Sequence, residues 1–154
     1  MVQRVRSASV TVGSERVGEI ERGLVVLLGV GAADRAQDGE RLASKISGLR
    51  IFDDASGKMQ LALADVDGAV LAVPQFTLYG DARHGRRPEF TAAAPPDVGR
   101  RLFDGFCGVL RGAGLTVRQG RFGATMTVAI EADGPVTLAL STDGWRESDL
   151  GTSG

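Results

Sequence analysis

The segment Gly23-Leu24-Val25-Val26-Leu27-Leu28-Gly29-Val30 decides the fold, because its apolar run is interrupted only by glycine. A continuous apolar run of this length predicts a strand that is buried on both faces. The run is also far shorter than the ~20 residues that an apolar helix needs to cross a bilayer. We therefore expect an interior strand in a protein without a membrane-spanning helix.

The residues before this strand predict a hairpin. Gly13-Ser14 predicts a turn, and residues 16–20 would form the return arm. No apolar stretch typical of a signal peptide is present, so a cytoplasmic protein is expected. The first arm alternates apolar and polar side chains in a broken period-two pattern, with its apolar positions at Val2, Val5, Ala8, Val10 and Val12.

Two amphipathic helices are predicted further along the chain. Residues 34–50 would form the first, with Asp34 as the expected N-cap. The second would begin at Pro95-Pro96 and end at Gly112 and Gly114. The apolar positions of the two helices are Leu42, Ile46 and Leu49 in the first, and Leu102, Phe103, Phe106, Val109 and Leu110 in the second.

The order of the elements predicts an α+β fold. It comprises a mostly antiparallel β-sheet, a barrel-like core and two main helices in a single domain. The domain is expected to span residues 1–140, followed by a flexible C-terminal tail at 141–154. The further extended candidates are 51–52, 58–63, 69–76, 115–119, 125–131 and 136–140, and a polar loop is predicted at 79–94.

The composition excludes several classes of site. A net charge of −1 argues against a long electrostatic grip on nucleic acid, although it permits contact with a short single-stranded RNA end. Cys107 and His84 are the only residues of their types, so a Cys/His zinc site is excluded and a Ser-His-Asp triad would need His84. No metal or cofactor is expected. Cys107 falls in the apolar stripe of the second helix, which predicts a buried structural thiol.

Two segments carry the candidate functional residues. Pro74-Gln75-Phe76-Thr77-Leu78 places an amide and a hydroxyl just past a buried strand, where binding sites often lie. The same side chains could merely end the strand. Gly134-Pro135 lies between two strand candidates, either as a simple turn or as a cis peptide that presents backbone carbonyls to a ligand. The residues alone leave both questions open.

An ordered series of short motifs resembles the D-aminoacyl-tRNA deacylase family. The similarity runs from about residue 2 to residue 140. Each motif alone is weak, whereas their order over a chain of this length is specific. The motifs are Gln3-Arg4-Val5, Gly57-Lys58-Met59, Gln75-Phe76-Thr77-Leu78, Gly85 with Arg87-Pro88, Gly120-Arg121-Phe122, Met126 and Asp133-Gly134-Pro135-Val136-Thr137.

The resemblance implies a homodimeric hydrolase that cleaves the ester bond of D-aminoacyl-tRNA at a cross-subunit active site. Gly134-Pro135 of one subunit would enter the other subunit's pocket as a cis peptide and leave no room for an L side chain. Arg4 would fix its orientation. The other implied roles are a pocket floor with backbone donors at Gln75, Phe76 and Thr77, and contacts to the terminal adenosine of the tRNA 3′ end at Phe122 and Met126.

Two mechanisms are compatible with this site. Backbone N–H groups near Phe76 and Thr77 would stabilise the developing oxyanion, an effect worth ~3–4 kcal/mol per donor in other enzymes. Thr77 could attack the ester, but the sequence shows no obvious base for it. Assistance by the neighbouring ribose hydroxyl of the tRNA is therefore favoured. Glycine is achiral and has no side chain for Gly134-Pro135 to exclude. Glycyl-tRNA mischarged on tRNA(Ala) is therefore an expected secondary substrate.

Departures from the family pattern leave alternatives open. Pro74 and Ala132 replace the usual serine and asparagine, and Pro74 resembles a sister branch that removes L-alanine from mischarged tRNA. That branch lacks the residues matching Phe76 and Arg4, so the D-specific branch is favoured. A non-catalytic module that binds the RNA end is the third hypothesis. The cluster Arg83, His84, Arg86 and Arg87 predicts either a solvated face or a contact to tRNA phosphates.

Overall fold

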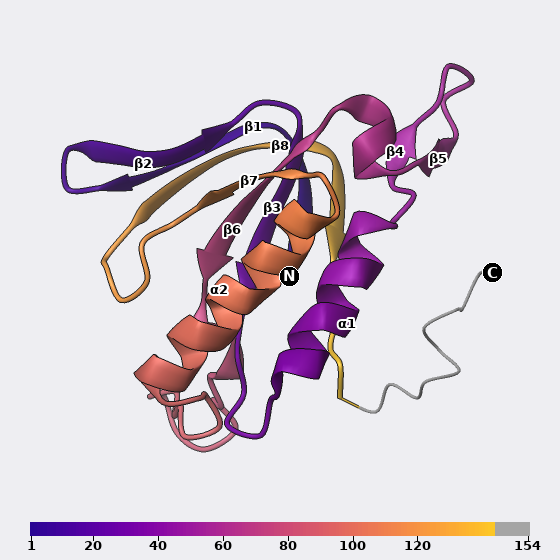
Figure 1. Ribbon diagram of the computed structural model, residues 1–154. Coiled ribbons are helices and arrows are strands. Elements are labelled where there is room, and N and C mark those ends of the chain that lie inside the picture. The colour runs from indigo at the N-terminus through magenta and orange to yellow at the C-terminus, as the bar shows by residue number, and fades with distance from the viewer. Residues whose placement is uncertain (144–154) are drawn as a thin grey trace.

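A computed structural model describes residues 1–143 of the chain as one α+β domain. Figure 1 shows two helices lying side by side across one face of a curved sheet. They are α1 (Ala36–Ser47) and α2 (Pro96–Gly112). The predicted tail at 141–154 falls outside the described residues from 144 onward. No helix among residues 1–143 is long and apolar enough to cross a membrane.

The main sheet is mixed, with an antiparallel half and a parallel half. Strand β1 (Val2–Val12) pairs antiparallel with β2 (Glu15–Ile20), β3 (Gly23–Leu28) and β8 (Thr127–Leu138). The parallel half was not predicted. There, β6 (Ala69–Pro74) lies between β3 and β7 (Thr116–Gln119), because each helix carries the chain back across the sheet. Contacts of β2 with β6 and β7 curl the sheet into the predicted barrel-like core.

Strand β3 confirms the prediction of an interior strand. Leu24 and Val26 pack into a core beneath the two helices, whereas Val25 packs into a second core on the opposite face of the sheet. A Cβ atom added at Gly23 would lie 1.9 Å from the backbone oxygen of Ala69. Glycine at this position therefore permits the close approach of β3 and β6.

Both predicted helices are present, but α1 spans Ala36–Ser47 and is shorter at both ends than the predicted 34–50. The N-cap of α1 is Arg35, so the expectation for Asp34 is wrong. The Asp38 carboxylate accepts a hydrogen bond from the Arg35 N–H at 2.8 Å. The backbone donor of the N-cap residue therefore has an acceptor. The Asp34 carboxylate instead accepts the Gly31 N–H at 2.7 Å and braces the loop before the helix. Cys107 is fully buried in α2, as predicted.

Within the extended candidate at 69–76, the strand ends at Pro74, as the proline predicts. Proline 74 closes β6, and Phe76–Tyr79 form a single-turn 3-10 helix, η2. The Gln75 N–H donates to the Leu28 oxygen at 2.8 Å and continues the parallel pairing by one bond. The remaining short elements are β4 (Phe52–Asp53), β5 (Met59–Leu61) and the 3-10 helix η1 (Leu63–Val66).

The two strands predicted at 125–131 and 136–140 are one strand, β8, so Gly134-Pro135 is not a turn between strands. The register against β1 jumps here, since Gln3 pairs with Thr137 and Val5 pairs with Ala132. Residues 133–136 therefore bulge opposite Arg4 alone. No residue of β8 is buried, so the strand forms a long exposed edge.

Candidate functional site

The 3-10 turn η2 places two backbone donors just beyond the end of β6. The first N–H groups of a helix have no acceptor within it. Accordingly, the hydrogen bonds of residues 1–143 include none from the backbone N–H of Phe76 or Thr77. The Leu78 N–H donates to the Gln75 oxygen at 3.3 Å, and the Gly80 N–H donates to the Thr77 oxygen at 3.0 Å. The later N–H groups of the turn therefore have backbone acceptors, whereas those of Phe76 and Thr77 are available to a ligand.

Thr77 lacks an activating base in this arrangement. Its Oγ1 accepts a short hydrogen bond from the Gln75 side-chain amide, which is neutral and donates rather than accepts. No histidine or carboxylate within residues 1–143 bonds to this hydroxyl. A polarised or positioned hydroxyl fits this geometry, whereas a deprotonated nucleophile does not.

A pocket of about 640 Å³ opens beside η2. It lies between the ends of β3 and β6, the start of α2 and the segment that leads into β8. Four predicted site residues line it together, namely Gln75, Phe76, Phe122 and Met126. Pro74, the departure from the family pattern, also lines it, whereas Thr77 does not. The pocket is largely apolar with an amide at its edge, which suits a flat aromatic ligand.

Aromatic rings form the rim of this pocket. Phe76 is 59% exposed and meets Phe90 edge to face, with 5.1 Å between the ring centroids. On the opposite side, the Arg100 guanidinium lies 4.9 Å from the centre of the Phe122 ring. Phe90 and Arg100 were missed in the sequence, because a loop residue and an exposed helix residue carry no local signal of a site.

Arg4 occupies a second locus, on β1 opposite the bulge of β8. Its side chain is 6% exposed and is the one buried polar side chain recorded for residues 1–143. Nη1 donates to the Ile51 oxygen at 2.7 Å and lies 3.5 Å from the Asp53 carboxylate. Nε donates to the Asp133 oxygen at 3.2 Å and lies 3.4 Å from the Asp133 carboxylate. Arg4 thus ties β1, β4 and β8 together at one point.

The bulge presents Gly134-Pro135 to solvent. The peptide bond between them is cis, and both residues are exposed. Gly134 has a φ of +116°, and an added Cβ atom would lie 3.0 Å from the Val136 N and 3.1 Å from Arg4 Nη2. Only glycine therefore fits this position. Neither residue lines the pocket beside η2 in the same chain, so one chain does not bring the two predicted halves of the site together.

The arginine-rich loop begins directly after η2. His84 is exposed, and no hydrogen bond or ion pair to its side chain is recorded within residues 1–143. Arg83 Nε donates to both oxygens of Asp81, at 2.9 and 3.0 Å. This bond lowers the pKa of Asp81 below its usual value, because the arginine favours the ionised carboxyl.

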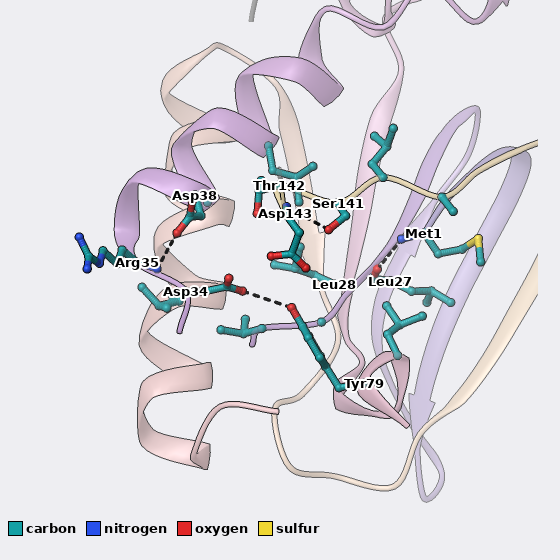
Figure 2. A pocket seen from close by; sticks show the side chains of 18 residues that line it. Met1, Leu27, Leu28, Asp34, Arg35, Asp38, Tyr79, Ser141, Thr142 and Asp143 are labelled. Atoms are coloured by element: carbon teal, nitrogen blue, oxygen red, sulfur yellow. Dashed lines mark hydrogen bonds between the residues drawn. The ribbon is translucent and has the colours of Figure 1, made fainter. Parts of the chain in front are cut away.

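A smaller cavity of about 320 Å³ borders the second half of η2 (Figure 2). The Tyr79 hydroxyl points across it and donates to Asp34 over 3.5 Å, a long hydrogen bond. Partial burial and the nearby Asp34 charge raise the pKa of Tyr79 to about 12. None of the predicted site residues lines this cavity. The Tyr79 ring packs against Gly29, where an added Cβ atom would lie 3.1 Å from it, and this contact leaves no room for a side chain at position 29.

Residues 1–143 contain no group of three or more His, Cys, Asp or Glu side chains placed to hold a metal ion. Burial raises the pKa of the Cys107 thiol, so this cysteine is poorly suited to act as a thiolate nucleophile. The polar groups beside η2 include the backbone N–H groups of Phe76 and Thr77, the Gln75 side-chain amide and the Thr77 hydroxyl.

Comparisons with known proteins agree with this arrangement. A family model described as D-Tyr-tRNA(Tyr) deacylase matches residues 1–141. A D-aminoacyl-tRNA deacylase of Thermotoga petrophila is 54% identical over 142 residues, covering 92% of this chain and 95% of that protein. A D-aminoacyl-tRNA deacylase of Chloroflexus aurantiacus is 55% identical over 142 residues, covering 92% of this chain and 89% of that protein.

Solved structures share the same fold. A structure titled c-Myc DNA unwinding element binding protein matches with a TM-score of 0.85 at 40% identity, covering 92% of this chain and 96% of that chain. A structure described as a probable eukaryotic D-amino acid tRNA deacylase matches with a TM-score of 0.77 at 20% identity, covering 87% of this chain and 93% of that chain. The second match supports the fold alone.

Proposed function

Because the chain belongs to the D-Tyr-tRNA(Tyr) deacylase family, we propose that it hydrolyses the ester bond between a D-amino acid and the 3′ end of tRNA. The observation that carries this proposal is the pair of free N–H groups of Phe76 and Thr77 beside a pocket of about 640 Å³. Such donors match the needs of ester hydrolysis, in which negative charge develops on the carbonyl oxygen.

The pocket would receive the terminal adenosine of the tRNA. Phe122 offers a face on which a base can stack, and Met126 supplies an adaptable apolar wall. With the base in this pocket, the ester on its ribose would lie near Gln75 and the start of η2. The amino acid would then extend out of the pocket, which suits a substrate class with many different side chains.

The proposed reaction needs little chemistry from side chains. Water adds to the ester carbonyl, and the N–H groups of Phe76 and Thr77 stabilise the oxyanion that forms. The bond from the carbonyl carbon to the ribose oxygen then breaks, and that oxygen takes up a proton. The neighbouring ribose hydroxyl of the tRNA assists this proton transfer, since Thr77 has no base beside it.

Chirality would be read by a second copy of the chain. In the proposed homodimer, Gly134-Pro135 of the partner subunit enters the pocket and blocks the space that an L side chain needs. Three features support this arrangement. The two residues are exposed, they do not line their own chain's pocket, and they lie on an edge strand without a buried residue. Glycine has no side chain to exclude, so glycyl-tRNA would be a secondary substrate.

One assay tests the proposal and its alternatives. The protein is incubated with D-tyrosyl-, L-alanyl- and L-tyrosyl-tRNA, and free amino acid is followed over time. Release from D-tyrosyl-tRNA alone supports the D-specific activity. Release of L-alanine would instead assign the sister activity suggested by Pro74, and binding without any release would leave a non-catalytic RNA-end-binding module.

A further inference from the structure

The loop between η2 and α2 forms a closed arm, residues 81–89, which we call the arginine arm. Its two ends pair as an antiparallel bridge. The Asp81 N–H donates to the Glu89 oxygen at 2.8 Å, and the Glu89 N–H donates to the Asp81 oxygen at 2.9 Å. The arm therefore leaves and re-enters the domain at one place, and its middle residues project into solvent.

Two of the three arginines in the arm have no partner recorded in residues 1–143. Arg83 is held by Asp81, so its charge is neutralised within the arm. Arg86 and Arg87 are exposed and form no recorded ion pair or hydrogen bond in the described part of the chain. The remaining carboxylate, Glu89, lies at the base of the arm. The tip thus carries two uncompensated guanidinium groups on a chain whose net charge is −1.

The arm is fixed to the candidate site at its base. Phe90 follows the arm directly, packs edge to face on Phe76 of η2, and lines the pocket. On the other flank, an added Cβ atom at Gly80 would lie 3.0 Å from the Phe90 ring. The next residues are also anchored, since the Ala32 N–H donates to the Ala92 oxygen at 2.9 Å. The base of the arm is therefore anchored beside the pocket, and Arg87 is three residues from Phe90 in the pocket wall.

We propose that Arg86 and Arg87 bind the phosphodiester backbone of the nucleic acid whose 3′ end enters the pocket. This inference rests on the proposed function, which places that 3′ end beside η2. Guanidinium groups suit the contact because they pair bidentately with phosphate oxygens and are always charged. The neutral pocket binds the terminal nucleoside, whereas the arm supplies the charge that a polyanion needs. This division explains how a chain with net negative charge can retain an RNA substrate.

The test compares R86A/R87A with a matched control, R50A/R118A, in the full chain. Arg50 and Arg118 are also exposed, carry the same total charge and do not line the pocket. We expect R86A/R87A to raise KM for D-aminoacyl-tRNA about tenfold at ~0.15 M salt and to leave kcat within about twofold. The slope of log(kcat/KM) against log salt should fall by about 1.5 to 2, for two phosphate contacts. The control should change neither quantity.

Two further measurements separate this inference from the proposed function. A D-aminoacyl ester of adenosine, which has no phosphate, should be cleaved equally by wild type and R86A/R87A. The dissociation constant for uncharged tRNA, measured without any hydrolysis, should rise in R86A/R87A and recover largely in R86K/R87K. An unchanged KM and an unchanged dissociation constant would overturn the inference while the hydrolytic activity stood. Equal impairment on the adenosine ester would also overturn it, since the arm would then act by shaping η2.

Discussion

Arg4 on β1 donates a hydrogen bond to the backbone oxygen of Asp133 on β8, 3.2 Å away, immediately before Gly134. The same side chain bonds the Ile51 oxygen at 2.7 Å, on the other side of the strand pair. One buried cation therefore sets the distance between the exposed Gly134-Pro135 bulge and the β4–β5 segment. This buried residue, 6% exposed, thus contacts the bulge from inside the protein.

Replacing Arg4 with alanine should lower the free energy of unfolding by about 2–5 kcal/mol, because the backbone oxygens of Ile51 and Asp133 lose the hydrogen bonds that Arg4 donates. Within residues 1–143, the Asp133 carboxylate keeps only Arg6, at 3.5 Å. R4K should fold better, yet a single ammonium cannot form the same fork of hydrogen bonds. We expect R4K to retain activity on D-tyrosyl-tRNA and to discriminate less well against L-tyrosyl-tRNA. Urea denaturation and the ratio of the two kcat/KM values measure these effects. If a folded R4K discriminated between D- and L-tyrosyl-tRNA as well as wild type does, Arg4 would have no role in chiral selection.

The pair T77A and T77P distinguishes the hydroxyl of Thr77 from its backbone N–H. Alanine keeps the N–H, so T77A should retain deacylation within a few-fold of wild type. Proline removes the N–H, and loss of one oxyanion donor should lower kcat by about 100- to 1000-fold. Thermal denaturation of both variants checks that η2 remains folded. A trapped threonyl ester on the wild-type chain would instead establish Thr77 as the nucleophile. An inactive T77A without such an ester would show that the hydroxyl is needed for positioning.

Phe122→Ala should weaken binding and spare the chemical step. The ring lines the pocket away from η2, and the loss of a base–aromatic stack costs about 1–3 kcal/mol. KM for D-aminoacyl-tRNA should therefore rise by roughly 5- to 100-fold with kcat nearly unchanged. F122W, which keeps a stacking face, serves as the matched control. A fall in kcat with an unaltered KM would remove Phe122 from the binding pocket.

Tyr79 should make stability fall at alkaline pH. Its pKa is raised to about 12 in the folded protein, from 10.0, so the folded state holds this proton when the unfolded state has lost it. Its contribution is complete below pH 10 and disappears as the pH rises through 12. The urea midpoint of wild type should fall more between pH 9 and about 11 than that of Y79F. Parallel curves for the two proteins would contradict this assignment.

The sequence predicts the elements of this fold better than their pairing. The apolar run of β3 and the stripes of α1 and α2 are local patterns, and the structure confirms them. The parallel pairing of β6 with β3 depends on where α1 returns the chain, and no local pattern contains that information. The wrong N-cap prediction for Asp34 has a similar cause. The Asp34 carboxylate accepts a hydrogen bond from the Gly31 N–H in the loop before α1, and the sequence around Asp34 does not show this contact.

Some residues of the candidate site can be predicted from the sequence, and others can be found only in the structure. The resemblance singled out Gln75, Phe76, Phe122 and Met126, and the structure brings these four residues to one pocket. Gly134-Pro135 looked like a turn because glycine and proline usually punctuate strands, whereas a bulge lets one strand continue through them. Phe90 lines the pocket through its contact with Phe76, and Arg100 lies over the Phe122 ring, so both positions depend on contacts between residues that are not neighbours in the sequence.

The free N–H groups at the start of η2 have a consequence for how this protein can evolve. Every amino acid except proline supplies the same donor, so substitutions at positions 76 and 77 would leave the proposed oxyanion donors in place. Side chains at these positions can drift while the chemistry persists. What selection must preserve is the path of the chain from β6 into η2. If the proposed mechanism holds, catalysis is inherited with the shape of the backbone at η2, and substitutions that disturb the packing of this turn would also disturb activity.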